Sequence, residues 1–209
     1  MDIKKIKKTL KKVWWFIWES NSIWSWIVCI ILAFIIIKFL VYPGLGLAFG
    51  TSYPIVAVVS SSMEHNGPFD QWWDSKAICE DKQCTQEEFY SIYNISREEF
   101  LEFKFRNGFN KGDIIFLFGT KPENIRIGDI IVFKTSKPDP IIHRVTNIKE
   151  ENGEIIFQTK GDHNVKPIEE SWLNEYSVPE DTLIGRGIFK IPYLGWIKIG
   201  FVKLITGFK

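Results

Sequence analysis

The hydrophobic pattern divides the chain into an apolar N-terminal stretch and a longer region of short apolar runs. From Ile23 to Ile37 no side chain carries a charge, and the apolar run continues past Lys38 to Leu40. A helix of this length can cross a bilayer if Lys38 extends its ammonium toward the headgroups. We therefore expect a transmembrane anchor over residues 21–42. A cleaved leader is the alternative, but the Trp-rich flank and the length of the segment favour a retained anchor.

Positive charge gathers before this segment, with six lysines at positions 4, 5, 7, 8, 11 and 12. Lysines beside a membrane segment favour the cytoplasmic side. We therefore expect residues 1–20 to form a cytoplasmic basic segment and the chain after the anchor to lie outside. Pro43, Gly44, Gly46 and Gly50 then indicate a short connector.

After the connector the pattern changes to short runs rich in Ile, Val and Phe, separated by Gly, Asp, Asn or Pro. Such runs are typical of β-strands. They cover residues 54–60, 113–119, 129–134, 141–149, 154–160 and 183–191. Because no helices alternate with them, we expect a mainly β chain whose residues 43–209 form a compact β-sheet domain. Two runs begin with Gly-Asp pairs, Gly112-Asp113 and Gly128-Asp129, which we interpret as turn chemistry.

Residues 65–110 interrupt the strand pattern with a polar stretch of mixed charge. Its second half has helical spacing, with apolar positions at Phe89, Ile92, Phe100 and Phe103. We expect an inserted, partly helical lobe over residues 65–110. The final segment, 193–209, is apolar with spaced lysines, which leaves open an interfacial amphipathic segment or a packed terminal helix or strand.

Composition excludes several classes of function. The formal net charge is +1, so a broad basic surface for nucleic acid is not expected. The three cysteines form no CxxC pair and the three histidines do not cluster, so we expect no metal and no cofactor. Cys79 and Cys84 lie close together; a disulfide between them and two free thiols remain equally open.

Candidate chemistry begins at Ser60-Ser61-Ser62-Met63-Glu64, which follows the first apolar run directly. A serine at a strand end is accessible and rigidly held, but its hydroxyl needs a base to act as a nucleophile at neutral pH. His65 and His163 lie in polar loops, and we expect His65 to be exposed.

His143 differs from the other two histidines because it lies inside an apolar run. It is either a hydrogen-bonded core residue or a general base. As a base it needs a carboxylate to hold its tautomer. A hairpin between runs 141–149 and 154–160 would bring Asp162 near His143.

Several blocks occur in the order found in type I signal peptidases. They are VAVVSSSME (56–64), KGDIIFL (111–117), IRIGDIIVFK (125–134), PIIHRV (140–145), FQTKGDHN (157–164) and RGIFKIPYLGW (186–196). The chain resembles the archaeal and endoplasmic-reticulum branch of that family, which works with Ser and His. The bacterial branch has a lysine base where IIHRV stands here.

The resemblance implies a membrane-bound serine endopeptidase that removes signal peptides from secreted proteins. It implies that Ser62 is the nucleophile, His143 the general base and Asp162 the acid that supports it. The Ser62 backbone N–H, helped by the Ser60 hydroxyl, would form the oxyanion hole. The partners would be signal peptides of secretory preproteins and the lipid bilayer, with the translocation machinery as a further candidate. The location would be the cell membrane, with one span and the catalytic domain outside.

Three departures from the family pattern matter. The lobe after Glu64 is longer than usual, and His65 replaces the proline that commonly follows the Ser-Met-Glu triplet. The family also has a second aspartate after the Lys-Gly-Asp block. Here that stretch reads VKPIEES, which leaves Glu169 and Glu170 as alternative acids. A catalytically inactive, membrane-tethered β module that binds peptides or a partner is therefore the alternative function.

Overall fold

The computed structural model describes residues 3–197 and 199–200. The chain divides into two compact units, Met1–Ala48 and Phe49–Lys209. Each unit is described by itself below, starting with the helical one.

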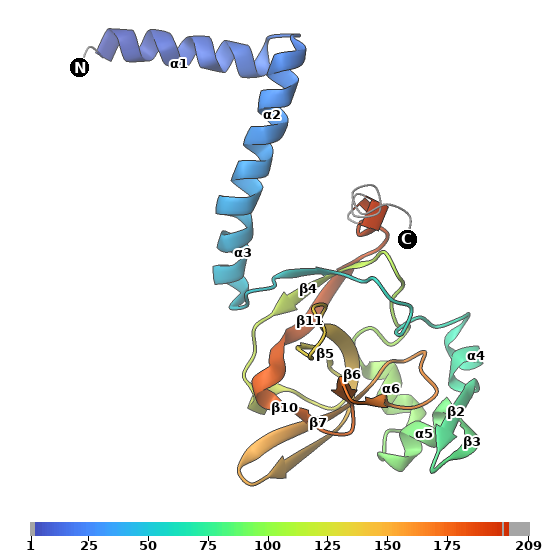
Figure 1. Ribbon diagram of the computed structural model, residues 1–209. Coiled ribbons are helices and arrows are strands. Elements are labelled where there is room, and N and C mark those ends of the chain that lie inside the picture. Colours follow the sequence, from blue (N-terminus) through green and yellow to red (C-terminus); the bar gives the residue numbers. More distant parts are fainter. Residues whose placement is uncertain (1–2, 198, 201–209) are drawn as a thin grey trace. The chain divides into compact units, whose positions relative to one another are not determined.

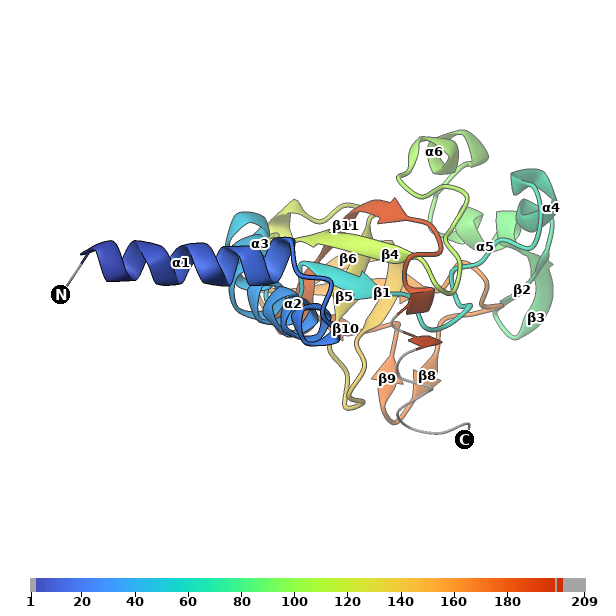
Figure 2. The same ribbon diagram turned by 90° about the horizontal axis from the view of Figure 1, so that it is seen from above.

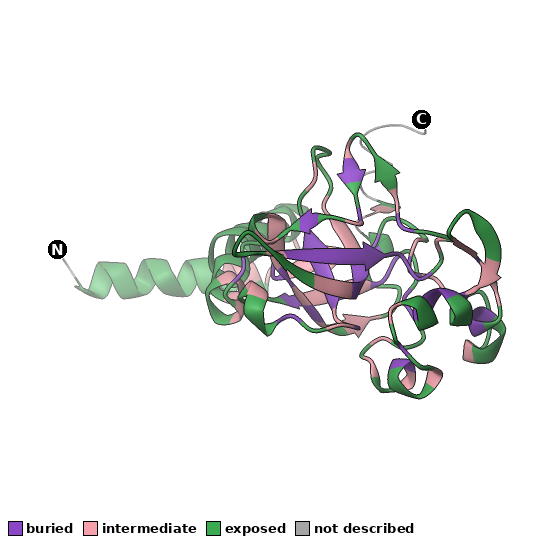
Figure 3. Ribbon diagram, turned by 90° about the horizontal axis from the view of Figure 1, so that it is seen from below, coloured by how far each residue is buried: buried purple, intermediate pink, exposed green. Residues whose placement is uncertain are grey.

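The N-terminal unit is helical, as the apolar pattern predicts. Helix α1 (Ile3–Trp18) carries the lysines and is exposed over most of its length, with no buried residue (Figure 3). Helix α2 (Ile23–Ile36) begins at Ser22, whose hydroxyl accepts a hydrogen bond from the Trp24 backbone N–H. It continues through a π-helical turn (Ile37–Val41) into α3 (Tyr42–Phe49).

The apolar helix extends beyond the predicted limit at residue 42. The combined helix Ile23–Phe49 has 27 residues and contains an 18-residue stretch with a mean hydropathy of 2.6. In the described part of the chain it alone is long and apolar enough to cross a membrane. The connector predicted at Pro43 and the following glycines is therefore wrong up to Phe49. Pro43 lies in the first turn after the π-helical segment, so its missing N–H is tolerated there. The helix ends before Gly50, whose φ is +65°.

The second unit is built on a curled antiparallel sheet, which confirms the mainly β prediction (Figure 1). Each predicted apolar run contains a strand of this sheet. The spatial order is β1 (Ile55–Ala57), β4 (Ile114–Phe118), β11 (Leu183–Ile191), β5 (Ile130–Phe133), β6 (Ile141–Glu151), β7 (Glu154–Lys160) and β10 (Val178–Pro179). A separate hairpin pairs β8 (Glu169–Glu170) with β9 (Leu173–Asn174), visible in Figure 2. Two 3₁₀ turns cover Pro122–Asn124 and Glu180–Thr182.

Strands β6 and β7 form the predicted hairpin. Its loop is Asn152-Gly153, with φ values of +55° and +84°, the sequence and conformation that two-residue hairpin turns favour. The register shifts once, between Val145 and Asn147. Because Arg144 pairs with Lys160, the hairpin places His143 and Arg144 beside the residues that follow Lys160.

The two Gly-Asp pairs are turns, as predicted. Gly112 and Gly128 have φ values of +90° and +88°, which an L-residue rarely adopts. The Asp113 carboxylate accepts a hydrogen bond from the Asn110 N–H at 2.9 Å, and Asp129 accepts one from the Arg126 N–H at 3.0 Å.

The inserted lobe holds short elements gathered beside one end of the sheet (Figures 1 and 2). They are α4 (Phe69–Trp73), β2 (Lys76–Cys79), β3 (Lys82–Thr85), α5 (Gln86–Ile92) and α6 (Arg97–Glu102). Its aromatic core includes Trp72, Trp73, Tyr90 and Phe100. The partly helical prediction is confirmed, although Ile92, predicted as an apolar core position, is 52% exposed.

The two questions about cysteines and the C-terminus have different outcomes. Cys79 and Cys84 form a disulfide across the β2–β3 hairpin. Of the segment 193–209, residues 198 and 201–209 lie outside the described part. Tyr193, Trp196 and Ile197 are exposed, and the choice between the two interpretations of this segment stays a prediction.

Candidate active site

The Ser61–Glu64 turn follows β1. It is held by one hydrogen bond within the turn and one from Phe109. Glu64 N–H donates to the Ser61 carbonyl at 3.0 Å, and the Phe109 N–H donates to the Met63 carbonyl at 3.0 Å. Met63 is 1% exposed and packs into the core of the sheet domain. Burying this side chain anchors the turn and leaves the neighbouring Ser62 only half-buried.

Ser62, His143 and one carboxylate form a continuous hydrogen-bonded row. Ser62 Oγ lies 2.9 Å from His143 Nε2. His143 Nδ1 lies 2.5 Å from Oε1 of Glu175. His143 is 2% exposed and Glu175 is fully buried, whereas the serine end reaches solvent. The row therefore runs from the interior to an accessible hydroxyl.

The surroundings of Glu175 decide the direction of these hydrogen bonds. Burial by itself raises the pKa of Glu175, but His143, the Ile168 amide and the Thr159 hydroxyl outweigh it and hold that pKa below its ordinary value. An ionised carboxylate only accepts, so His143 Nδ1–H donates to Glu175. In a neutral imidazole, His143 Nε2 then carries the lone pair and accepts from the Ser62 hydroxyl.

Asp162 makes no hydrogen bond to His143 in the described structure, so the expected hydrogen-bonded pair of these two residues is not formed there. Both Asp162 oxygens accept from Arg144, Oδ1 from Nε at 2.9 Å and Oδ2 from NH2 at 2.7 Å. His143 and Arg144 are successive residues of β6, so their side chains leave opposite faces of the strand. The bidentate pair with the guanidinium holds the Asp162 carboxylate on the Arg144 side.

Arg144 and Asp162 are both fully buried, and each carries the charge that compensates the other. Burial opposes ionisation of Asp162, but the Arg144 guanidinium and His65 lower the pKa of Asp162 well below its ordinary value. Arg144 also donates to the carbonyls of Lys104, Phe105 and Gly128. The pair is thus a structural link between β6, the 160s and the end of the lobe.

The remaining predicted site residues fall into two groups. Ser60 Oγ lies 3.1 Å from Ser62 Oγ, so the structure brings it to the site. Glu169 and Glu170 are exposed on β8 and have no hydrogen bond to His143 within the described chain. His65, expected to be exposed, has a side chain that is 2% exposed and bonds Asp162 Oδ2 at 3.0 Å.

Sequence reasoning missed Glu175. It lies directly after β9, beyond the window in which carboxylates near Lys-Gly-Asp were considered. The Glu175 N–H donates to the Ile168 carbonyl, and its own carbonyl accepts from the Thr159 N–H. These backbone contacts place the Glu175 carboxylate next to His143 Nδ1. The spacing of residues in the sequence does not predict them.

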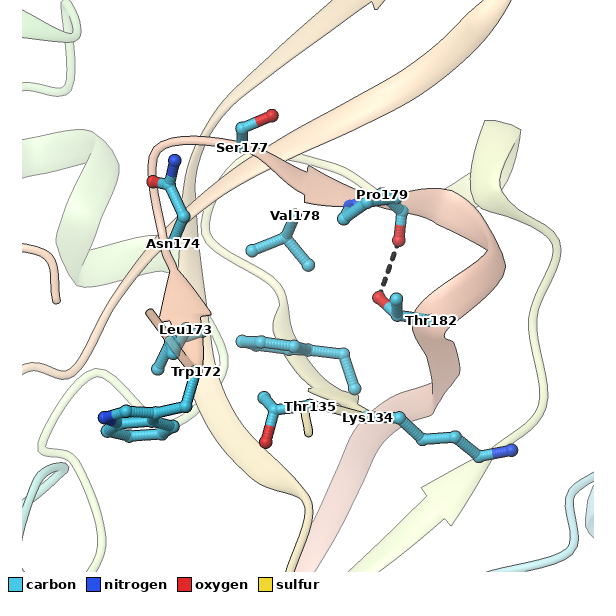
Figure 4. Close-up of a pocket in the computed structure, with 10 residues that line it drawn as sticks. Lys134, Thr135, Trp172, Leu173, Asn174, Ser177, Val178, Pro179 and Thr182 are labelled. Carbon is cyan, nitrogen blue, oxygen red and sulfur yellow. Dashed lines mark hydrogen bonds between the residues drawn. The ribbon is translucent and has the colours of Figure 1, made fainter. Parts of the chain in front are cut away.

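One cavity of the domain is lined by the β9–β10 region and the end of β5. It has a volume of about 130 Å³ and is lined by residues including Trp172, Val178 and Thr182, and in Figure 4 these side chains surround it. None of Ser62, His143 or Glu175 lines this cavity. Among the described residues no group of His, Cys, Asp and Glu could hold a metal ion. The chemistry at the site is that of a hydroxyl, an imidazole and a carboxylate.

Comparison with known proteins identifies relatives over part of the chain. No protein-family model matches. The human and dog proteins named signal peptidase complex catalytic subunit SEC11C are 37% identical over 99 residues, covering 44% of this chain and 49% of theirs. The signal peptidase complex catalytic subunit SEC11 of Candida tropicalis is 30% identical over 96 residues, covering 44% of this chain and 56% of that protein.

The chain therefore spans about half the length of the curated relatives it matches. Within the matched part, the resemblance to type I signal peptidases of the endoplasmic-reticulum branch is confirmed.

Proposed function

We propose that this chain is a membrane-anchored serine endopeptidase that removes signal peptides from secretory preproteins. The observation that carries the proposal is the row Ser62–His143–Glu175, with both hydrogen bonds at or below 2.9 Å. A hydroxyl, a neutral imidazole accepting from it and a buried carboxylate on the far ring nitrogen are the parts that acyl transfer to serine requires. The relatives' names, which are those of signal peptidase catalytic subunits, support the substrate class.

The proposed reaction uses each of these groups in turn. Ser62 Oγ attacks the carbonyl carbon of the scissile peptide bond while His143 Nε2 takes the hydroxyl proton. Glu175 stabilises the imidazolium that forms. The imidazolium then gives its proton to the leaving amine as the C–N bond breaks, which leaves an acyl ester on Ser62. Water, deprotonated by His143, attacks the acyl carbon, and the imidazolium gives that proton to Ser62 Oγ as the ester bond breaks.

Charge on the substrate oxygen needs donors near Ser62. The Ser62 hydroxyl donates to His143, so in the resting site the Ser60 hydroxyl donates to Ser62 Oγ. When Ser62 Oγ becomes bonded to carbon, the Ser60 hydroxyl is free to turn toward the substrate oxygen. We assign it, with the Ser62 backbone N–H, to the oxyanion hole.

Substrate binding follows from the position of β1. It is the last strand on its side of the seven-stranded sheet, so its outer edge is open within the described structure. An extended peptide adding to that edge would run toward Ser62, which follows β1 in the chain. Shallow contacts there would admit small side chains next to the cleaved bond.

The same proposal covers the location. The apolar helix Ile23–Phe49 would span the cell membrane once, with the lysine-bearing α1 in the cytoplasm and the sheet domain outside. The lipid bilayer is then a partner, and the translocation machinery supplies the preprotein. Anchoring enzyme and preprotein in one membrane raises their effective concentration.

The test is cleavage of a synthetic signal peptide by the full chain purified in detergent micelles. Wild-type protein should cleave, Ser62→Ala should lose activity by several orders of magnitude, and Ser61→Ala should keep most of it. Ser61 is exposed and one position away, which makes it a matched control. If the wild type neither cleaves nor reacts with a fluorophosphonate at Ser62, the chain is instead the inactive peptide-binding module.

A further inference from the structure

Several residues of the inserted lobe, residues 65–110, make hydrogen bonds to one short segment of the sheet domain. That segment is the turn Lys160–Val165, which begins at the last residue of β7. The lobe makes hydrogen bonds to side chains and backbone of Lys160, Asp162, Asn164 and Val165. The resemblance to signal peptidases explains the Lys-Gly-Asp block itself but assigns no role to the lobe.

The contacts to Asp162 come from three aromatic rings of the lobe. Trp72 Nε1–H donates to the Asp162 carbonyl at 2.9 Å. The Tyr90 hydroxyl donates to Asp162 Oδ1 at 3.3 Å, and His65 Nε2 lies 3.0 Å from Oδ2. Burial, with the Asp162 charge, raises the pKa of Tyr90 well above its ordinary value, so its hydroxyl keeps the proton that it donates. The His65 ring also stacks on Trp72, with ring centres 3.7 Å apart.

The ends of the turn are held from the lobe as well. Gln86, which is 1% exposed, accepts from Lys160 Nζ at 2.8 Å and donates to the Asn164 carbonyl at 3.4 Å. The Ile78 N–H donates to the Val165 carbonyl at 2.8 Å. Lys160 is fully buried and its ammonium lies 5.0 Å from the centre of the Phe89 ring. The lobe thus fixes the turn at its beginning, middle and end.

The turn in its own right holds the proposed nucleophile. The His163 N–H donates to the Ser62 carbonyl at 2.9 Å, and the Asp162 N–H donates to Met63 Sδ at 3.3 Å. Gly161 packs so closely that a Cβ there would lie 2.7 Å from the Ser62 carbonyl oxygen and 2.9 Å from His143 Nε2. A shift of this turn therefore moves Ser62 relative to His143.

We propose that the lobe is a brace for the active site, and that Trp72 and Tyr90 are positioning residues that act on Ser62 through the Lys160–Val165 turn. The inference rests on the proposed function for its kinetic consequence, since it deepens the account of the same site. Neither residue has a hydrogen bond to Ser62 or His143 in the described structure. Their effect is to hold the turn in one place, which preserves the geometry that acyl transfer needs.

The lobe offers matched neighbours for both residues. Trp73 is as deeply buried as Trp72, at 2% and 3% exposed, but its Nε1–H has no hydrogen-bond partner in the described structure. Tyr93 lies one turn after Tyr90 at the end of α5, and its hydroxyl makes no hydrogen bond to described residues. Replacing Trp or Tyr by Phe removes the same atoms from each member of a pair.

The experiment compares two double variants of the full chain in detergent. One is Trp72→Phe with Tyr90→Phe, and the control is Trp73→Phe with Tyr93→Phe. Two readouts are taken: kcat and KM for the signal peptide, and the hydrogen-exchange rate of the His163 backbone amide. The first double variant should lose about tenfold to a hundredfold in kcat with KM changed less than about twofold, because it loses one hydrogen bond to a backbone carbonyl and one to an ionised carboxylate.

The exchange readout separates this inference from the proposed function. The His163 amide should exchange faster in Trp72→Phe with Tyr90→Phe and at the wild-type rate in the control. Equal kcat or equal exchange in the two double variants would overturn the brace. If the wild type has no hydrolase activity, the proposed function fails, and the exchange comparison alone decides whether the lobe holds the turn.

Discussion

The Nδ1 atom of His143 lies 2.5 Å from Oε1 of Glu175, on the opposite side of the imidazole from Ser62. Glu175 is held in that position by the Thr159 hydroxyl at 2.8 Å and the Ile168 N–H at 2.8 Å. The glutamate therefore occupies the place that the sequence led us to expect for Asp162. Since the residue's role rests on the proposed function, it calls for a direct test.

The first prediction concerns this glutamate. Glu175→Gln keeps the shape but can donate a hydrogen bond to Nδ1, which favours the wrong imidazole tautomer. We expect kcat to fall by about two to four orders of magnitude with little change in folding. Peptide cleavage and thermal unfolding measure the two effects. Glu169→Gln and Glu170→Gln, both on the exposed hairpin β8–β9, are the controls and should stay active; full activity in Glu175→Gln would remove it from the mechanism.

Asp162 should behave differently from Glu175, because its partner is Arg144. The change Asp162→Asn leaves the buried guanidinium of Arg144 without its counter-charge. Breaking a buried pair in this way costs about 3–5 kcal/mol of folding stability. We therefore expect a large fall in the unfolding temperature, measured by circular dichroism in detergent. A variant that unfolds like the wild type would contradict this structural role.

The third prediction concerns Gly161, whose backbone packs closely against Ser62 and His143. Gly161→Ala would place a Cβ 2.7 Å from the Ser62 carbonyl oxygen, which is backbone and cannot turn aside. The clash should displace Ser62 from His143 and lower kcat by about tenfold or more. Gly44→Ala in α3 is the control, since a Cβ there meets nothing within 4 Å. Equal kcat in the two variants would show that the Gly161 contact is not needed.

The fourth prediction concerns acid. The pKa values of Asp162 and Glu175 are held below their ordinary values, 3.8 and 4.5, in the folded protein. The unfolded chain then binds more protons than the folded one as pH falls, so stability is full above the ordinary carboxyl range and declines below it. Urea unfolding between pH 3 and 7 should show this decline for the wild type. Glu175→Gln should show a shallower one, and an unchanged slope would contradict the shift assigned to Glu175.

The fifth prediction concerns orientation. If the sheet domain lies outside, trypsin added to right-side-out vesicles should cut at Lys76 or Lys82, which are exposed in the lobe. Because Cys79 and Cys84 are joined, the fragments must be separated under reducing conditions. Cutting in inverted vesicles alone would contradict the outward-facing domain. A covering subunit would be recognised by cutting that begins only after detergent extraction.

Local patterns predicted the elements that depend on neighbouring residues. The predicted runs 154–160 and 183–191 have the same bounds as β7 and β11, because short stretches containing Ile and Phe between turn residues favour β-strands. The apolar span was also found from its local pattern, although its end was placed too early, at residue 42 instead of Phe49. Ser62 and His143 were singled out from sequence, and the structure places Ser62 Oγ 2.9 Å from His143 Nε2.

What only the tertiary structure decided were contacts between residues far apart in the chain. The sequence contains several carboxylates after β7, and nothing local distinguishes Glu175 from Glu169 or Glu170. Folding distinguishes them, because the Glu175 backbone is bonded to Ile168 and Thr159, which turns its side chain under His143. Asp162 was drawn instead to Arg144, and His65 from an apparently exposed loop was buried against it. The partner of each buried charged group depends on which groups the folded chain brings together. The spacing of residues along the sequence does not predict these partners.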